Sequence, residues 1–187
     1  ILARGGSKGI KNKNLINLNN KPLIFWSIKS CLSSKLIHEV WVSSDSNKIL
    51  KISKKFGAKI ILRPKKFASD NSSSENAWIH AIKLIDKNNL VKTVVGIQPT
   101  SPLRPSQCFD KAIIKYKKKK LDSLFSSQKI TDHFIWKIKN KKFISNYNFK
   151  KRPMRQNIKE KYLENGSFYI FDKTKFLKNK CRLFGKI

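Results

Sequence analysis

The sequence predicts a doubly wound α/β fold, in which a mostly parallel sheet carries helices on both faces. Short apolar segments alternate with amphipathic segments of helical periodicity from residue 22 to residue 118, as in strand–helix–strand units. A glycine-rich loop at residues 5–9 follows the apolar start of the chain, where an open α/β sheet binds its ligand. The 187 residues, of which 40% are hydrophobic, suit one globular domain over residues 1–187.

The expected elements follow one another along the chain. Residues 1–3 are expected to end a first strand. Pro22 suits the first turn of a helix that continues to about residue 34, because its φ is already helical. Further strands are expected at residues 40–42, 59–62, 91–98, 121–126 and 167–171, a hairpin at 134–138 and 142–144, and further helices at 47–56, 74–87, 106–118 and 174–177. No internal repeat and no interdomain linker is visible.

Basic residues dominate the charge, with 42 lysines and arginines against 11 acidic residues and a net charge of +31. This charge is compatible with a basic nucleic-acid-binding domain, which stays an alternative of a different class. Only six of the basic residues are arginine, however, and base readout and bidentate phosphate contacts favour arginine. We therefore expect no nucleic-acid partner. No apolar run is long enough to span a bilayer, so we expect no membrane partner either.

The cysteines and histidines show no spacing typical of a metal site or a catalytic pair. They are Cys31, Cys108 and Cys181, and His38, His80 and His133. An odd number of widely spaced cysteines indicates reduced thiols and a cytoplasmic protein. The histidines are expected to be structural or exposed.

The stretch LARGGSKGIKNKN, residues 2–14, combines three glycines with basic residues. Glycine permits tight turns, and a loop of backbone N–H groups with lysines among them binds phosphate oxygens. The spacing matches neither GxxxxGK[ST] nor GxGxxG, so a flexible surface loop is the alternative. The order of strand, loop and helix favours a site for a nucleoside triphosphate.

The string RGGSKGIKNKN resembles the signature loop of the acylneuraminate cytidylyltransferases, the CMP-sialic acid synthetase family, which usually reads R-x-G-S-K-G-I-x-x-K-N. Three later stretches resemble the same family in the same order, LRPKKFASDNSSS, IQPTSPLR and RQ…YLENGSFYIF. The resemblance implies a Rossmann-like nucleotide-diphospho-sugar transferase fold. It also implies a cytoplasmic, homodimeric, Mg²⁺-dependent enzyme that converts CTP and a nine-carbon 2-keto sugar acid into the CMP-sugar and pyrophosphate, for cell-surface polysaccharide.

The resemblance also assigns site residues. Those expected to act in catalysis are Lys13, Arg4 and Lys8. Those expected to bind the nucleotide are Arg4, Ser7, Lys8, Lys13, Asn14, Arg63 and Ser74. Those expected to bind the sugar acid are Gln98, Thr100, Arg155, Gln156, Tyr162 and Asn165.

Several of these positions have a structural explanation as well. Asp45 ends a strand and either orders the nucleotide site or caps the following helix. Ser74 is a candidate cap of the next helix, and capping is compatible with ligand contact. Asn165 and Gly166 are typical of a turn. Arg104 is a candidate secondary contact, although turn geometry explains the prolines around it equally well.

One departure from the family concerns the metal. The family carries two closely spaced aspartates after its final strands, and these bind Mg²⁺. This chain starts at Ile1 without methionine and ends at Ile187 before that segment, while Asp122, Asp132 and Asp172 are isolated. We therefore expect a domain truncated at both ends, with no metal ligand of its own and slow turnover or none. The sequence is also compatible with an inactive homologue, and with a cytidylyltransferase for a 3-deoxy-manno-octulosonate-type sugar.

Overall fold

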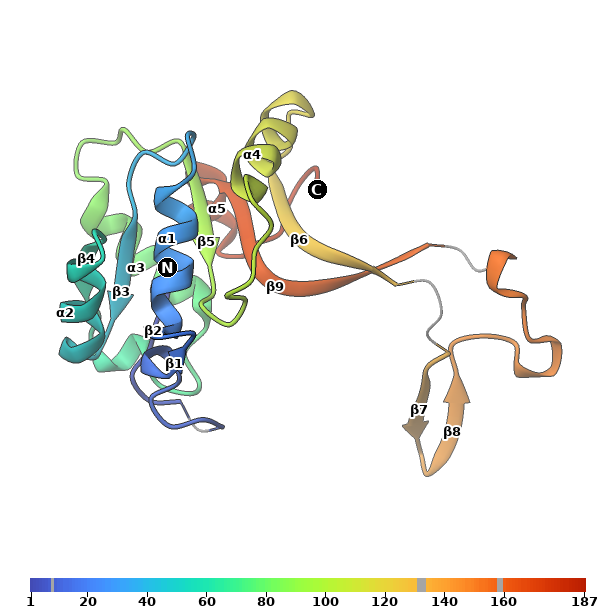
Figure 1. Cartoon of the computed structure of the whole chain (residues 1–187). Helices are drawn as coiled ribbons and strands as arrows, with labels where there is room; N and C mark the ends of the chain where they lie inside the picture. Colours follow the sequence, from blue (N-terminus) through green and yellow to red (C-terminus); the bar gives the residue numbers. More distant parts are fainter. Residues whose placement is uncertain (8, 131–133, 158–159) are drawn as a thin grey trace. The chain divides into compact units, whose positions relative to one another are not determined.

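The structure, a computed structural model, describes residues 1–7, 9–130, 134–157 and 160–187 (Figure 1). The chain forms two compact units, unit 1 with Ile1–Phe125 and Gly166–Ile187, and unit 2 with Ser126–Asn165. Unit 2 is therefore inserted into the sequence of unit 1. The expectation of one domain over residues 1–187 stays a prediction.

The helices and strands alternate through the first 118 residues, as expected. The α-helices are α1 (Leu23–Leu32), α2 (Asn47–Lys55), α3 (Ser74–Ile85), α4 (Cys108–Lys118) and α5 (Lys173–Asn179). The strands are β1 (Asn17–Leu18), β2 (Lys21–Pro22), β3 (Trp41–Ser44), β4 (Lys59–Leu62), β5 (Thr93–Ile97), β6 (Ser123–Ile130), β7 (Trp136–Lys139), β8 (Lys142–Ser145) and β9 (Lys161–Asp172). Among the described residues, none of the helices has both the length and the apolar character needed to cross a bilayer.

The start of the chain, where Leu2 forms an isolated parallel bridge with Ser43, connects two groups of strands. β3 pairs in parallel with β4, and β9 lies between β5 and β6. The N–H of Ala3 donates to the carbonyl of Ser43 at 3.0 Å, and the N–H of Leu2 donates to the carbonyl of Ile97 at 3.2 Å. Residues 1–3 therefore lie between β3 and β5, which gives the order β4, β3, residues 1–3, β5, β9, β6.

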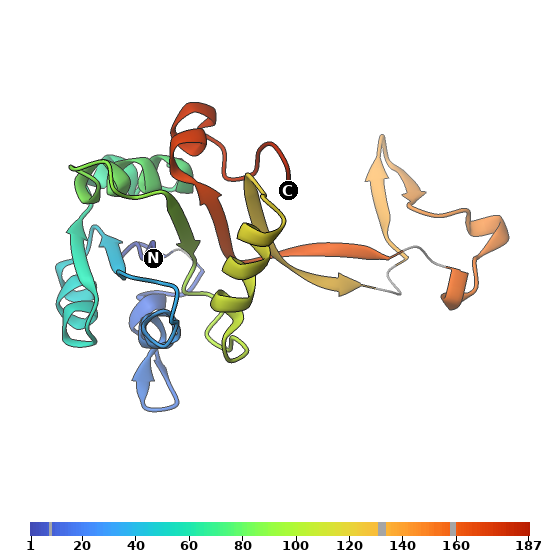
Figure 2. The same cartoon turned by 90° about the horizontal axis from the view of Figure 1, so that it is seen from above.

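Helices cover both faces of this sheet, as the alternation of side chains along β9 shows. Phe168 and Ile170 belong to a core that includes residues of α1, α2 and α4. Tyr169 and Phe171 belong to a second core that includes residues of α3 and α5. Figure 2 shows α1 and α4 on one side of the strands and α3 and α5 on the other. The predicted doubly wound α/β class is confirmed.

Two parts of unit 1 differ from the expectation. The first helix begins at Leu23 rather than at Pro22, which lies in β2 and precedes the helix as its N-cap. The last strand is longer than the expected residues 167–171 and runs antiparallel to β5. Its first five residues are exposed, so they carry no apolar pattern that would have marked them as a strand.

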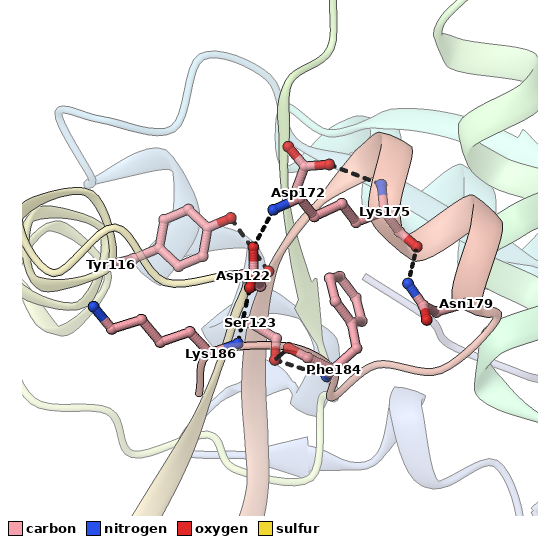
Figure 3. A network of polar contacts seen from close by, with 8 residues as sticks. All are labelled: Tyr116, Asp122, Ser123, Asp172, Lys175, Asn179, Phe184 and Lys186. Atoms are coloured by element: carbon pink, nitrogen blue, oxygen red, sulfur yellow. Dashed lines mark hydrogen bonds and ion pairs between the residues drawn. The ribbon is translucent and has the colours of Figure 1, made fainter.

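The C-terminal segment after α5 is hydrogen-bonded to Asp122, directly before β6, and to Ser123, the first residue of β6 (Figure 3). Asp122 accepts the N–H of Lys186 at 2.8 Å and pairs with Lys175 on α5. The hydroxyl of Ser123 donates to the carbonyl of Phe184 at 2.8 Å and accepts the N–H of the same residue at 2.9 Å. These contacts hold the last residues of the chain along the first residues of β6.

Unit 2 contains the expected hairpin, in which β7 pairs antiparallel with β8. Asn140 and Lys141 connect the two strands with φ values of 51° and 59°. Two positive φ values in succession are typical of the type I′ turn that matches the twist of a hairpin. Trp136 packs against Tyr147 and Phe149, with ring centroids 6.0 Å and 5.5 Å apart.

Candidate functional site

The glycine-rich loop is fixed at both ends, at the edge of the sheet where the strand of residues 1–3 and β3 finish. The N–H of Gly5 donates to Oδ1 of Asp45 at 2.8 Å. Asn14, only 4% exposed, donates from Nδ2 to the carbonyl of Arg4 at 2.9 Å. A Cβ on Gly5 would lie 2.9 Å from Cβ of Ser46, so only glycine fits there. These contacts hold the two ends of the loop, at Gly5 and Asn14, and the phosphate-binding role of the residues between them stays a prediction.

Two helix caps differ from the expectation. The N-cap of α2 is Ser46, and not Asp45, which instead orders the loop through Gly5. The N-cap of α3 is Ser73, whose hydroxyl accepts an N–H from the first turn, whereas Ser74 is the first helical residue. In both cases the capping position belongs to the extended residue directly before the helix. The predicted contact of Ser74 with the nucleotide stays a prediction.

Arg63 brings a buried cation to the same edge. It follows β4 directly, its N–H donates to the carbonyl of Ser44 at 2.8 Å, and it is 5% exposed. Within the described residues, its Nε and Nη2 have no hydrogen-bond partner. Burial lowers the pKa of Arg63, an effect that Asp45 opposes and Arg4 increases. A buried charge with unpaired donors is costly, so these two donors are suited to a ligand that accepts hydrogen bonds.

The basic residues of the loop itself are more accessible. Arg4 pairs with Asp70 at 2.7 Å, and the two side chains are 37% and 43% exposed. An exposed pair of this kind contributes about 0–1 kcal/mol, so a phosphate can replace Asp70 at small cost. Ser7 and Lys13 are half-buried, and Lys8 lies outside the described residues. The sequence reasoning missed Asp70, although it lies in the stretch that resembles the family.

Gln98 leaves β5 at the carboxyl end of this strand and is held against β9. Its N–H donates to the carbonyl of Ser167 at 3.3 Å. A Cβ on Gly166 would lie 3.6 Å from Oε1 of Gln98, so the glutamine side chain lies beside this glycine. Thr100 is exposed in the following turn. The position of Gln98 agrees with the expectation for an α/β ligand site.

The remaining predicted sugar-acid contacts lie in unit 2. Arg155 and Gln156 belong to a short 3₁₀ helix, Arg155–Asn157, and Tyr162 and Asn165 lie on β9. A common site of these residues with Gln98, which belongs to unit 1, stays a prediction.

The two residues on β9 have partners within unit 2. Oδ1 of Asn165 accepts a hydrogen bond from the hydroxyl of Ser126 at 2.6 Å. The hydroxyl of Tyr162 donates to Glu160 at 2.8 Å, and Glu160 raises the pKa of Tyr162. The alternative that Asn165 and Gly166 form a turn is wrong, because both residues lie inside β9.

The described residues do not form a magnesium site by themselves. Leaving aside Asp132 and His133, which lie outside the described residues, no three His, Cys, Asp or Glu side chains come together as metal ligands. Asp45 and Asp70, the carboxylates that contact the loop, are engaged with Gly5 and Arg4.

Comparison with known proteins supplies the family. The family model described as cytidylyltransferase matches residues 1–184. The chain is 36% identical over 179 residues to N-acylneuraminate cytidylyltransferase A of Danio rerio, covering 92% of this chain and 40% of that protein. It is 31% identical over 181 residues to the pseudaminic acid cytidylyltransferase of Campylobacter jejuni, covering 91% of this chain and 75% of that protein. The chain thus spans about 40% of the length of several curated relatives that it matches.

Solved structures agree on the fold. A CMP:2-keto-3-deoxy-manno-octonic acid synthetase complexed with CTP superposes with a TM-score of 0.71 at 17% identity, covering 100% of this chain and 77% of that one. The 4-diphosphocytidyl-2C-methyl-D-erythritol synthase of Anaerococcus prevotii gives a TM-score of 0.64 at 15% identity, with coverage of 98% and 78%. Since the family model matches nearly every residue and the relatives exceed 30% identity, the chain belongs to the cytidylyltransferase family.

Proposed function

We propose that this protein activates an acidic nine-carbon sugar, an N-acylneuraminate or a related nonulosonic acid, with CTP to give the CMP-sugar and pyrophosphate. The observation that carries the proposal is Arg63, whose two buried donors have no partner in the described residues. It lies at the sheet edge where the glycine loop is anchored through Gly5 and Asn14. Such donors and loop N–H groups suit a nucleoside triphosphate. The relatives named for N-acylneuraminate and pseudaminic acid support the class of sugar.

In the proposed reaction the anomeric hydroxyl of the sugar acid attacks the α-phosphorus of CTP in line. The oxygen–phosphorus bond to the sugar forms, the bond from the α-phosphorus to the bridging oxygen breaks, pyrophosphate leaves, and the hydroxyl proton passes to solvent water. Lys13, with Arg4 and Lys8, neutralises the charge that moves to the leaving pyrophosphate. The contribution of the protein is therefore mainly positioning and electrostatics.

We keep Mg²⁺ as a proposed cofactor, which offsets phosphate charge when it is bound. Mg²⁺ usually takes one or two carboxylates and completes its shell with water and substrate phosphates. Because the described residues offer no cluster of carboxylates, most of its ligands would come from the triphosphate and water.

A homodimer and a cytoplasmic location are also part of the proposal. Unit 2 exposes several large apolar side chains, namely Ile135, Trp136, Ile138, Phe143, Ile144 and Phe149. Exposed apolar groups of this kind are typical of a surface that binds another protein. The three cysteines are free thiols, as expected in a reducing compartment. Sedimentation equilibrium that shows only monomer at micromolar concentration would contradict the homodimer.

Calorimetry tests nucleotide binding, with CTP, UTP, ATP and GTP titrated in the presence of Mg²⁺. Of the four nucleotides, only CTP is expected to give heat of binding. The absence of heat with CTP would contradict the proposal. Release of pyrophosphate with N-acetylneuraminate, pseudaminate or 3-deoxy-manno-octulosonate then identifies the sugar, and a preference for the last supports the eight-carbon alternative. Tight duplex binding with a steep salt dependence would instead support a nucleic-acid-binding domain.

A matched pair of variants tests the loop. Lys13→Ala should lower turnover by a factor of ten or more (order of magnitude, from the loss of one charge-stabilising contact) without lowering the melting temperature. Lys11→Ala removes an exposed lysine from the same loop and is the control. Equal activity of Lys13→Ala and wild type would contradict a catalytic role for Lys13.

A further inference from the structure

We infer that Arg104 is a positioning residue that holds Gln98 in the orientation the sugar acid requires. The inference rests on the proposed function, because it concerns the sugar subsite of the same reaction. It gives Arg104 a defined task, where the sequence left a choice between a secondary substrate contact and a simple turn residue.

All three nitrogens of the Arg104 guanidinium donate to acceptors of unit 1. Nη2 donates to the carbonyl of Gln98 at 2.7 Å and to the carbonyl of Ser167 at 3.0 Å. Nε donates to the hydroxyl of Ser167 at 3.0 Å, and Nη1 donates to the hydroxyl of Ser27 at 3.0 Å. One planar fork thus connects the end of β5 with β9 and α1. Its geometry fixes all three, which a lysine cannot do.

Gln98 depends on this fork because its backbone is held from two sides. Its N–H donates to Ser167, and its carbonyl accepts from Arg104, so the peptide groups before and after its Cα are both fixed. The backbone angles φ and ψ between these peptide groups limit the rotamers that the Gln98 side chain can adopt. The next residue, Pro99, has no N–H, so it cannot donate a hydrogen bond that would hold the turn if the contact with Arg104 were lost.

The four hydrogen bonds of Arg104 all go to neutral acceptors. No carboxylate within the described ranges forms an ion pair with Arg104, although its guanidinium is half-buried and lies 5.7 Å from the ring centroid of Phe109. Burial lowers the pKa of Arg104, yet arginine stays protonated in proteins. A cation with only neutral partners leaves a positive potential beside Gln98. That potential attracts the carboxylate of a sugar acid.

Steady-state kinetics of Arg104→Lys test the inference, because lysine keeps the charge and loses the fork. We expect the KM for the sugar acid to rise about tenfold, with an unchanged KM for CTP, as expected when binding contacts of one substrate are lost. The control is Arg182→Lys, which removes another arginine fork, bonded to Glu75 at 2.6 Å and 3.0 Å. That variant should lower the melting temperature without a selective change in the KM for the sugar acid. Equal changes in both KM values of Arg104→Lys, or no change in either, would overturn the inference.

A second measurement does not need catalysis. The side-chain amide signal of Gln98 in a ¹⁵N–¹H NMR spectrum is assigned by its absence in Gln98→Leu. We expect this signal to shift or broaden in Arg104→Lys, and an unchanged signal would contradict the positioning role. If the wild-type protein transfers CMP to no sugar acid, the proposed function fails, while the NMR result still decides whether Arg104 holds Gln98.

Discussion

Replacing Arg63 by methionine should separate ligand binding from stability. Methionine has a similar length and is apolar, so the variant fills the buried space without a charge. Within the described residues, the Nε and Nη2 of Arg63 have no hydrogen-bond partner. Each unsatisfied buried donor costs about 1–3 kcal/mol, and the variant removes two of them. It also removes the attraction to Asp45, which offsets part of this gain.

The expected free energy of unfolding of Arg63→Met is therefore unchanged or higher by up to about 2 kcal/mol. The expected effect on CTP has the opposite sign. Two hydrogen bonds from a charged group contribute about 1.5–3 kcal/mol each, so their loss weakens the affinity for CTP by a factor of about 10²–10⁴.

Urea unfolding and calorimetry with CTP and Mg²⁺ measure the two quantities on the same preparation. The control is Lys65→Met, which removes an exposed lysine two positions further along the chain. This variant should change the affinity for CTP by less than a factor of about three, since an exposed charge is screened. A loss of more than about 1 kcal/mol in stability, together with unchanged affinity for CTP, would show that Arg63 is structural and refute the reasoning.

Three further predictions concern the packing and titration of unit 1. A Cβ on Gly96 would lie 2.6 Å from Cζ2 of Trp78, so Gly96→Ala should lower the free energy of unfolding by about 1–3 kcal/mol, and Trp78→Phe should relieve part of this cost in the double variant. Strict additivity in urea unfolding would contradict this contact. Iodoacetamide should modify the exposed Cys181 first and spare Cys31, because burial raises the pKa of the Cys31 thiol to about 11. Mass spectrometry that finds both labelled at the same rate would contradict the burial of Cys31. Burial also lowers the pKa of His80 from 6.5, so the unfolded state takes up the proton first and the free energy of unfolding should fall as the pH drops below this value. In His80→Gln the free energy of unfolding should depend less on pH. An unchanged slope would contradict the role of His80.

The parallel part of the fold could be predicted from the sequence because burial imposes a local pattern there. The strand expected at residues 59–62 is β4 with the same bounds, and the helix expected at residues 47–56 is α2, Asn47–Lys55. The helix is marked by apolar residues at helical spacing, and the strand by the short apolar run of residues 60–62. The first five residues of β9 lack this signal, because their side chains are exposed. Only the second part of the strand, from Phe168 to Asp172, pairs with β5, which lies far away in the sequence.

In the candidate site, too, a local sequence pattern cannot predict contacts with distant residues, as two identical tripeptides show. Leu62–Pro64 and Leu103–Pro105 both read Leu-Arg-Pro, so no local pattern distinguishes Arg63 from Arg104. In the structure, Arg104 donates from all three nitrogens to acceptors that include Ser27 and Ser167, 77 and 63 positions away in the sequence. Arg63 instead has two donors without a partner in the described part of the chain. Acceptors far away in the sequence therefore decide which arginine is bonded within the protein, as Arg104 is, and which has donors available for a ligand, as Arg63 has. Arg63→Met and Arg104→Lys change the same residue type in the same local sequence. We therefore expect the first variant to weaken the affinity for CTP and the second to raise the KM for the sugar acid.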